Sequence, residues 1–196
     1  MTVFRLGLTG SIGMGKSTTA AFFAASGLPV WDADAAVHRL YAPGGQAVQS
    51  VAALCPAALR DAAIDRDVLR GWIKADPTAL SRLEAVVHPL VATDRSTFFS
   101  QITNGIAVFD IPLLFENAID AEMDATLLVT APAALQRQRV LSRPGMTEAQ
   151  FAMILARQLP DREKRARATH IVETLSLDQT RAYVQALIAH LQSSHA

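Results

Sequence analysis

The residue types best suited to chemistry first gather in residues 10–17, which read Gly-Ser-Ile-Gly-Met-Gly-Lys-Ser. This segment matches G-x-x-x-x-G-K-[ST], the P-loop pattern. Its glycines let successive backbone N–H groups turn inward around a phosphate, and a helix that follows adds its positive N-terminal end. We expect Lys16 to reach the β and γ phosphates and the Ser17 hydroxyl to ligate the Mg²⁺ that bridges them. The predicted nucleotide-binding residues are Gly10, Ser11, Ile12, Gly13, Met14, Gly15, Lys16, Ser17 and Thr18.

The order of apolar and helical segments predicts how this loop is held. Residues 3–8 form a short apolar stretch suited to a buried strand, and residues 18–25 read as a helix, which is the setting that a P-loop requires. Further strand candidates, separated by helical patterns, are residues 28–31, 106–111, 125–130 and the weaker 170–172. We therefore predict an α/β fold, a P-loop NTPase-type parallel sheet flanked by helices, with ligands at the carboxyl ends of the strands.

The other segments are predicted to be helical parts of the same single domain. Residues 35–104 contain no convincing strand, only helical stretches that are broken at Pro43, Pro56, Pro77 and Pro89. The apolar spacing of residues 177–192 predicts a helix packed on the sheet. We expect a helical insertion over about 35–104, a lid over about 136–167, and a core made of residues 1–34, 105–135 and 168–196.

Composition and charge narrow the classes of function. The 196 residues carry 18 basic and 18 acidic side chains, yet residues 137–167 hold eight basic and three acidic ones. Because this basic region lacks interleaved aromatics, a lid that closes over phosphates explains it better than a nucleic-acid surface; a solvated helix face is the alternative. The single Cys55 indicates a reducing compartment, and no stretch reaches the roughly 18 apolar residues of a membrane span. We expect a cytoplasmic protein with no membrane, nucleic-acid or obligate protein partner.

Two arginines of the basic region are candidates for contact with the nucleotide phosphates. Arg139 and Arg143 are four residues apart, which would place both on one face of a helix. Guanidinium groups make charge-assisted hydrogen bonds to phosphate oxygens. We favour Arg139 for the phosphate that is transferred, and a solvent-facing role is the alternative for either side chain.

Two carboxylates at the end of the second strand candidate help to separate the functions that a P-loop allows. Asp32 and Asp34 are spaced by one residue and would point to opposite sides of an extended strand unless the chain turns there. Asp34 could accept the proton of an acceptor hydroxyl or could be the N-cap of the next helix. Asp32 could orient a magnesium-bound water or cap that helix. The sequence has no NKxD signature, so nothing in it indicates a guanine-specific switch.

Taken in order, these motifs resemble those of the dephospho-CoA kinase family over nearly the whole chain. The later motifs are weak one by one, and their order along the chain gives them their meaning. The resemblance is carried by residues 7–17, Asp32-Ala33-Asp34, Ile64-Asp65-Arg66 with Leu69, residues 83–89, residues 110–116, Gln136, Arg139, Arg143 and Arg157-Gln158.

The resemblance implies ATP-dependent phosphorylation of the ribose 3′-hydroxyl of dephospho-CoA, which yields CoA and ADP. Its ligands would be ATP, Mg²⁺ and dephospho-CoA. The catalytic candidates are Asp34 as the base, with Lys16 and Arg139 stabilising the moving phosphoryl group, and Arg143 would join the nucleotide-binding residues. Asp110, which ends an apolar run, is a candidate magnesium ligand beside Ser17. The implied acceptor-site residues are Asp32, Asp34, His88, Pro112, Leu113 and Glu116.

The chain departs from the family pattern at three places. Ser11 replaces a common glycine, which the P-loop pattern tolerates. Thr169 and Thr174 stand where A-D-x-x-I-x-N has its acid and its asparagine, at the turn expected to contact the nucleotide base. Residues 54–56 replace a common Phe-Gly. From the residues alone, two other functions stay open: a different small-molecule P-loop kinase, of nucleoside, nucleotide or shikimate type, and a nucleotide-binding regulator without transferase activity.

Overall fold

A five-stranded parallel sheet holds the P-loop. The computed structural model describes residues 3–194, and the strands of this sheet are β1 (Phe4–Thr9), β2 (Val30–Asp32), β5 (Ile106–Asp110), β6 (Ala125–Thr130) and β7 (His170–Glu173). They lie in the order β2-β5-β1-β6-β7; β1 is parallel to β5 and to β6, and β6 is parallel to β7. The predicted fold class is confirmed, and each predicted strand lies within two residues of an observed one.

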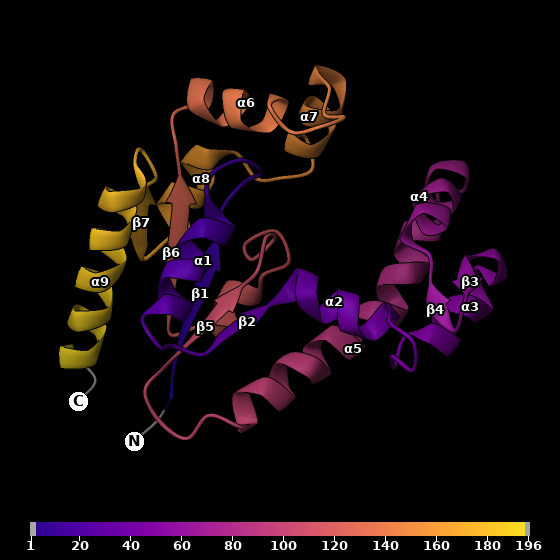
Figure 1. Ribbon diagram of the computed structural model, residues 1–196, viewed down its shortest axis with the longest axis horizontal. Coiled ribbons are helices and arrows are strands. Elements are labelled where there is room, and N and C mark those ends of the chain that lie inside the picture. The colour runs from indigo at the N-terminus through magenta and orange to yellow at the C-terminus, as the bar shows by residue number, and fades with distance from the viewer. Residues whose placement is uncertain (1–2, 195–196) are drawn as a thin grey trace. The chain divides into compact units, whose positions relative to one another are not determined.

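Burial explains why the central strands read as continuous apolar runs. Every residue of β5 and of β6 is buried, as expected of parallel strands covered on both faces. Helices α1 (Lys16–Ala25), α8 (Asp161–Arg167) and α9 (Leu177–Ser194) contact strands of the sheet. Unit 1, the part of the chain that contains the sheet, also has α6 (Ala133–Leu141), α7 (Glu148–Leu155) and a short 3-10 helix at Ile119–Glu122. The predicted C-terminal helix is confirmed as α9, which contacts α1 (Figure 1). Its buried side chains belong to the core around β1 and β6. Among residues 3–194, no helix is both long enough and apolar enough to cross a membrane.

The chain divides into two compact units. Unit 1 comprises the described residues up to Trp31 and from Ile102 onward, and it contains the sheet. Unit 2, Asp32–Gln101, contains α2 (Ala33–Tyr41), α3 (Val48–Leu54), a 3-10 turn (Pro56–Ala58), β3 (Leu59–Arg60), β4 (Ala63–Ile64), α4 (Arg66–Ala75) and α5 (Ala79–Ser100). Unit 2 buries a core of its own that includes Val51, Leu69 and Val87.

The prediction that residues 35–104 contain no strand is wrong. β3 and β4 form a small antiparallel hairpin within unit 2. Each strand has two residues, which is too short for an alternating pattern to be recognised. The turn between them consists of Asp61 and Ala62, both with positive φ, and the glycine or asparagine that usually announces such a turn is absent.

The prediction that Pro89 ends a helix is also wrong, because α5 continues through it. A proline in a helix interior loses one backbone hydrogen bond and costs about 3 kcal/mol. The flanking turns of α5 bury Leu83 and Val87 in the unit 2 core, and the helix packs against α2, α3 and α4. Tertiary packing of this kind outweighs a single lost hydrogen bond.

Candidate active site

The P-loop leaves the N-terminus of α1 open to an anion. Gly15 is the N-cap of α1, with φ 92°, and no side chain caps that end. The first backbone N–H groups of a helix have no partner within it, so those of α1 are available to phosphate oxygens. Within the loop, the Met14 N–H donates to the Ser11 carbonyl at 3.1 Å. Ser17 and Thr18 are exposed at the start of the helix.

Helix α6 packs directly on the loop at Gly13. The φ of Gly13 is 78°, and a Cβ atom there would lie 2.4 Å from Val140 Cγ2 and 3.1 Å from the Gln136 carbonyl oxygen. Both Gln136 and Val140 lie on α6 and are buried. The loop therefore needs glycine at position 13 for two reasons, the left-handed backbone and the closeness of α6.

Lys16 forms an ion pair with Asp110 inside unit 1. Asp110 is the last residue of β5, which lies beside β1, and this adjacency brings the carboxylate to the loop. The two side chains are 14% and 2% exposed. The paired carboxylate holds the Lys16 ammonium group at the carboxyl ends of the strands, where a bound triphosphate would meet it.

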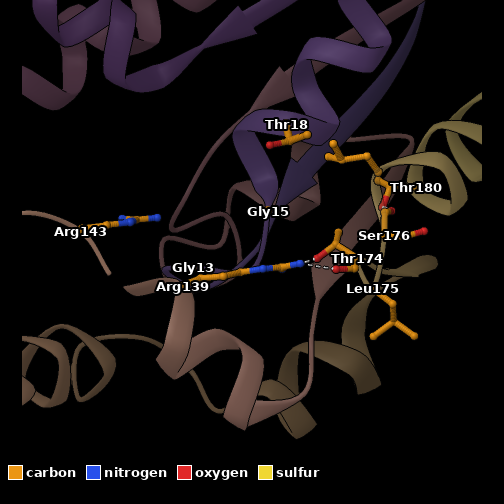
Figure 2. Close-up of a pocket in the computed structure, with 10 residues that line it drawn as sticks. Gly13, Gly15, Thr18, Arg139, Arg143, Thr174, Leu175, Ser176 and Thr180 are labelled. Atoms are coloured by element: carbon orange, nitrogen blue, oxygen red, sulfur yellow. Dashed lines mark hydrogen bonds between the residues drawn. The ribbon is translucent and has the colours of Figure 1, made fainter. Parts of the chain in front are cut away.

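A cavity of about 370 Å³ opens beside the P-loop. Arg139 crosses it: Nη1 donates to Thr174 Oγ1 at 2.9 Å, and Nη2 donates to the Thr174 carbonyl at 2.6 Å (Figure 2). The P-loop, residues 139–143 and the chain after β7 together supply its lining, which consists of Gly13, Gly15, Thr18, Arg139, Arg143, Thr174, Leu175, Ser176, Leu177 and Thr180.

The expectation that Arg139 and Arg143 share one helix face is wrong, although both line the cavity. Helix α6 ends at Leu141, so Arg143 lies in the turn beyond it. Arg143 precedes Pro144, which disfavours the helical conformation at position 143, and Gly145 follows with φ 75°. The two guanidinium groups therefore approach the cavity from different local structures (Figure 2).

Thr174, a departure from the family pattern, connects three parts of the site. Its hydroxyl donates to the Met14 carbonyl at 2.7 Å while it accepts from Arg139, and its backbone N–H donates to the Thr130 carbonyl at 2.9 Å. A threonine thus links Arg139 to the P-loop at this turn. The other departure, Thr169, instead exchanges hydrogen bonds with Thr126 on the neighbouring strand.

The cavity lining from Leu175 to Thr180 was not among the predicted site residues. Leu175 and Leu177 are 52% and 62% exposed, which is unusual for leucine beside a compact core. Their position directly after β7 could have indicated that these residues lie at the site, because the carboxyl ends of parallel strands share one edge of the sheet.

Comparison with known proteins identifies the family. The family model for dephospho-CoA kinases matches residues 4–178. The chain belongs to the dephospho-CoA kinase family. A dephospho-CoA kinase from Cereibacter sphaeroides is 70% identical over 194 residues, which cover 99% of this chain and 98% of that protein. The resemblance noted in the sequence is thereby confirmed.

Solved structures agree with the fold of this dephospho-CoA kinase family member. TT1252 from Thermus thermophilus superposes with a TM-score of 0.85 at 35% identity, covering 97% of this chain and 99% of that one. A dephospho-CoA kinase from Campylobacter jejuni gives a TM-score of 0.67 at 20% identity, covering 95% and 96%, and this likeness concerns the fold alone.

In this kinase-family chain, the segment after β5 turns its acidic residue inward. It makes successive turns over residues 112–118, and the short 3-10 helix Ile119–Glu122 follows. The Pro112 carbonyl accepts from Thr9 Oγ1 at 3.2 Å. Glu116 Oε1 accepts from the Leu159 N–H at 2.8 Å and lies 2.8 Å from Nζ of Lys164, which is fully buried. Glu116 therefore has partners within unit 1; its acceptor role, with those of Pro112 and Leu113, stays a prediction.

Unit 2 holds the remaining predicted residues of the kinase. Asp32 is the N-cap of α2, and its Oδ1 accepts from the Ala35 N–H at 3.0 Å. The chain therefore turns at this point, so the alternation of an extended strand does not apply to the two aspartates. Asp34 lies exposed in the first turn of α2 and is not the N-cap. His88 is exposed in the interior of α5, and its acceptor role stays a prediction.

The donor atoms near the P-loop suit a magnesium ion that is held mainly by nucleotide phosphates. Among residues 3–194, no group of three or more His, Cys, Asp or Glu side chains could hold a metal ion. Mg²⁺ commonly keeps several waters and binds through one or two protein oxygens plus phosphates. The exposed Ser17 hydroxyl at the start of α1 fits that role, whereas Asp110 is paired with Lys16.

Proposed function

We propose that this chain transfers the γ-phosphoryl group of ATP to the ribose 3′-hydroxyl of dephospho-CoA, giving CoA and ADP. The observation that carries the proposal is that the P-loop and Arg139 line the same cavity in a member of the dephospho-CoA kinase family. We infer a cytoplasmic location from the single cysteine.

The nucleotide would span the cavity from the P-loop to the leucines after β7. Its β and γ phosphates would accept hydrogen bonds from the open N-terminal amides of α1. Arg139, already oriented by Thr174, would meet phosphate oxygens from the opposite side. Leu175 and Leu177 are exposed apolar surfaces on which a nucleotide base can pack. A preorganised set of donors around a phosphoryl group is the main catalytic requirement of phosphoryl transfer.

Lys16 would exchange one anionic partner for another during the reaction. In the structure its ammonium group pairs with Asp110, and a triphosphate at the loop would compete for the same three N–H donors. When bound, Mg²⁺ would neutralise charge on the phosphates. Ser17 would supply a protein oxygen to it, and Asp110 would supply either a second oxygen or one to a bound water.

In the transfer step, Asp34 is the proposed base. Its carboxylate would take the proton of the 3′-hydroxyl while the 3′-oxygen bonds to the γ phosphorus. The bond from the γ phosphorus to the β–γ bridging oxygen would break, and ADP would leave with the bridging oxygen. The exposed carboxylate of Asp34 supports this role because its neighbour Asp32 already caps α2, which leaves Asp34 without that structural task. Asp32, His88, Pro112, Leu113 and Glu116 are proposed to shape the acceptor site.

The proposed function is tested by measuring ADP release from ATP and Mg²⁺ with dephospho-CoA, nucleosides, shikimate and other small alcohols as acceptors, with mass spectrometry of the products. Dephospho-CoA that gains one phosphoryl group and behaves as CoA supports the proposal. Consumption of another acceptor in its place would refute the proposed substrate, and ATP binding without any acceptor-stimulated ADP release would favour a regulator.

The role of Asp34 has a matched test within unit 2. Loss of a general base typically lowers turnover by about 10²–10⁴-fold, so Asp34→Asn should lose activity on this scale while still binding ATP. Asp67 is also an acidic residue in the first turn of a helix, α4, and Asp67→Asn is the control that should keep turnover near that of the unchanged chain. Similar turnover in the two variants would show that Asp34 is not the base.

A further inference from the structure

Two glutamine side chains hold the backbone of Ile12 from opposite sides. Nε2 of Gln136 donates to the Ile12 carbonyl at 2.8 Å. The Ile12 N–H donates to Oε1 of Gln158 at 3.1 Å. Because the backbone fixes which atom donates, each amide side chain has one defined orientation. Gln136 acts here as a donor and Gln158 as an acceptor.

The two glutamines lie on α6 and after α7, both within residues 136–167. Gln136 lies on α6, is 6% exposed, and precedes Arg139 by three residues, so the two side chains lie on neighbouring positions of that helix. Gln158 follows the end of α7. The Ile12 backbone is therefore the point at which α6 and the segment after α7 both attach to the P-loop.

A buried ion pair secures the Gln158 side of this attachment. The residue after Gln158 is Leu159, whose N–H donates to Oε1 of Glu116 at 2.8 Å. Glu116 in turn lies 2.8 Å from Nζ of Lys164, which is fully buried. On the opposite side, Val140 of α6 stands against Gly13. Ile12 is thus held by elements that are themselves packed within unit 1.

We propose that Gln136 and Gln158 are positioning residues that couple the P-loop to the lid region. With its N–H bonded to Gln158, Ile12 contributes no donor to the phosphate, and the donors are left to later amides of the loop and to the open N-terminus of α1. With its carbonyl bonded to Gln136, Ile12 fixes the start of α6 and hence the place of Arg139 at the cavity. The inference rests on the proposed function in one respect, that the cavity binds ATP.

The opposite hydrogen-bond roles of the two glutamines give an asymmetric test. Gln158→Glu keeps an acceptor for the Ile12 N–H, whereas Gln158→Met removes it. Gln136→Glu sets a carboxylate oxygen against the Ile12 carbonyl, whereas Gln136→Met removes the donor without adding repulsion. Gln138→Glu is the matched control because Gln138 is exposed on the same helix. Circular dichroism and thermal unfolding would show that each variant is folded.

The readouts are the Kd for ATP with Mg²⁺ by calorimetry, which needs no acceptor, and kcat and KM for ATP. A buried backbone group left without its partner costs about 1–3 kcal/mol, or about ten- to hundredfold in binding. We expect losses on that scale in kcat/KM and in ATP affinity for both Met variants and for Gln136→Glu. Of the two Gln136 variants, Gln136→Glu should have the lower kcat/KM and the lower ATP affinity. Gln158→Glu should be clearly more active than Gln158→Met.

The proposal would be overturned if the Glu variant were more active than the Met variant at both positions, or less active at both. It would also be overturned if the Gln136 and Gln158 variants bound ATP as tightly as Gln138→Glu does. Failure of the proposed function would look different. The unchanged chain would then bind ATP without phosphorylating dephospho-CoA, and the Kd values would still decide whether the two glutamines position the loop.

Discussion

Replacing Gly13 by alanine should damage the nucleotide site more than it damages a comparable turn elsewhere. An L residue in the left-handed region costs about 1–2 kcal/mol, and the φ of Gly13 is 78°. The added Cβ would also lie 2.4 Å from Val140 Cγ2, and overpacking of this kind costs about 1–3 kcal/mol. The free energy of unfolding should therefore fall by about 2–5 kcal/mol.

Gly27 provides a control that separates the two contributions. Its φ is 82°, and a Cβ atom there would meet nothing within 4 Å. Gly27→Ala should therefore lose only the backbone part, about 1–2 kcal/mol. Urea unfolding of both variants measures the difference, and calorimetry with ATP and Mg²⁺ measures the accompanying loss of affinity, which only Gly13→Ala should show because only there must α6 move.

A double-mutant cycle adds an internal check. Val140→Ala removes the methyl group that the new Cβ would meet, so Gly13→Ala should be less harmful in that background. The reasoning would be refuted if Gly13→Ala and Gly27→Ala had the same stability and the same ATP affinity. That result would mean that α6 does not rest on the loop as the structure shows.

Three further predictions concern other parts of the chain. Lys164→Met leaves the Glu116 carboxylate without its buried partner and should lower the unfolding free energy by about 3–5 kcal/mol, whereas adding Glu116→Gln should restore part of the loss; a double variant no more stable than the single one in urea would contradict this. Burial, with a smaller contribution from His190, lowers the pKa of His170, so the unfolded chain binds a proton below about pH 6.5 that the folded chain resists. Stability should therefore fall as the pH drops through that value, and melting temperatures between about pH 8 and about pH 5.5 should fall less in His170→Gln; equal slopes would exclude this effect. Asp32→Ala removes the cap of α2 and should cost about 1 kcal/mol of unfolding free energy, and an unchanged urea midpoint would show that the cap adds nothing.

The sequence predicts those parts of the site that depend on local pattern. The P-loop motif placed its residues between β1 and α1 correctly, because glycine spacing and a buried apolar strand are both visible along the chain. The ends of β6 were predicted to the residue, since a strand buried on both faces reads as a nearly continuous run of apolar and β-branched residues.

The parts that depend on distant partners could not be predicted in this way. Glu116 and Lys164 read as a substrate contact and as one charge of a basic lid, yet they form a buried pair across 48 positions of sequence. Burial of a charge is decided by whether the fold supplies its partner, and local spacing carries no information about that. For the same reason the pairing of Lys16 with Asp110 was missed, although both residues were placed at the site.

The order of the strands in the sheet has a consequence for synthesis of the chain. β1 lies between β5 and β6, which begin only at Ile106 and Ala125. A ribosome therefore releases β1 long before either neighbour exists. Unit 2 is one uninterrupted stretch with its own core, so it is complete before sheet assembly can begin. A nascent chain that stalls once Gln101 has left the ribosome would carry a complete unit 2 and an unpaired apolar strand, the kind of surface that chaperones bind. The phosphate-binding loop is thus among the first parts to be made and among the last to take its shape.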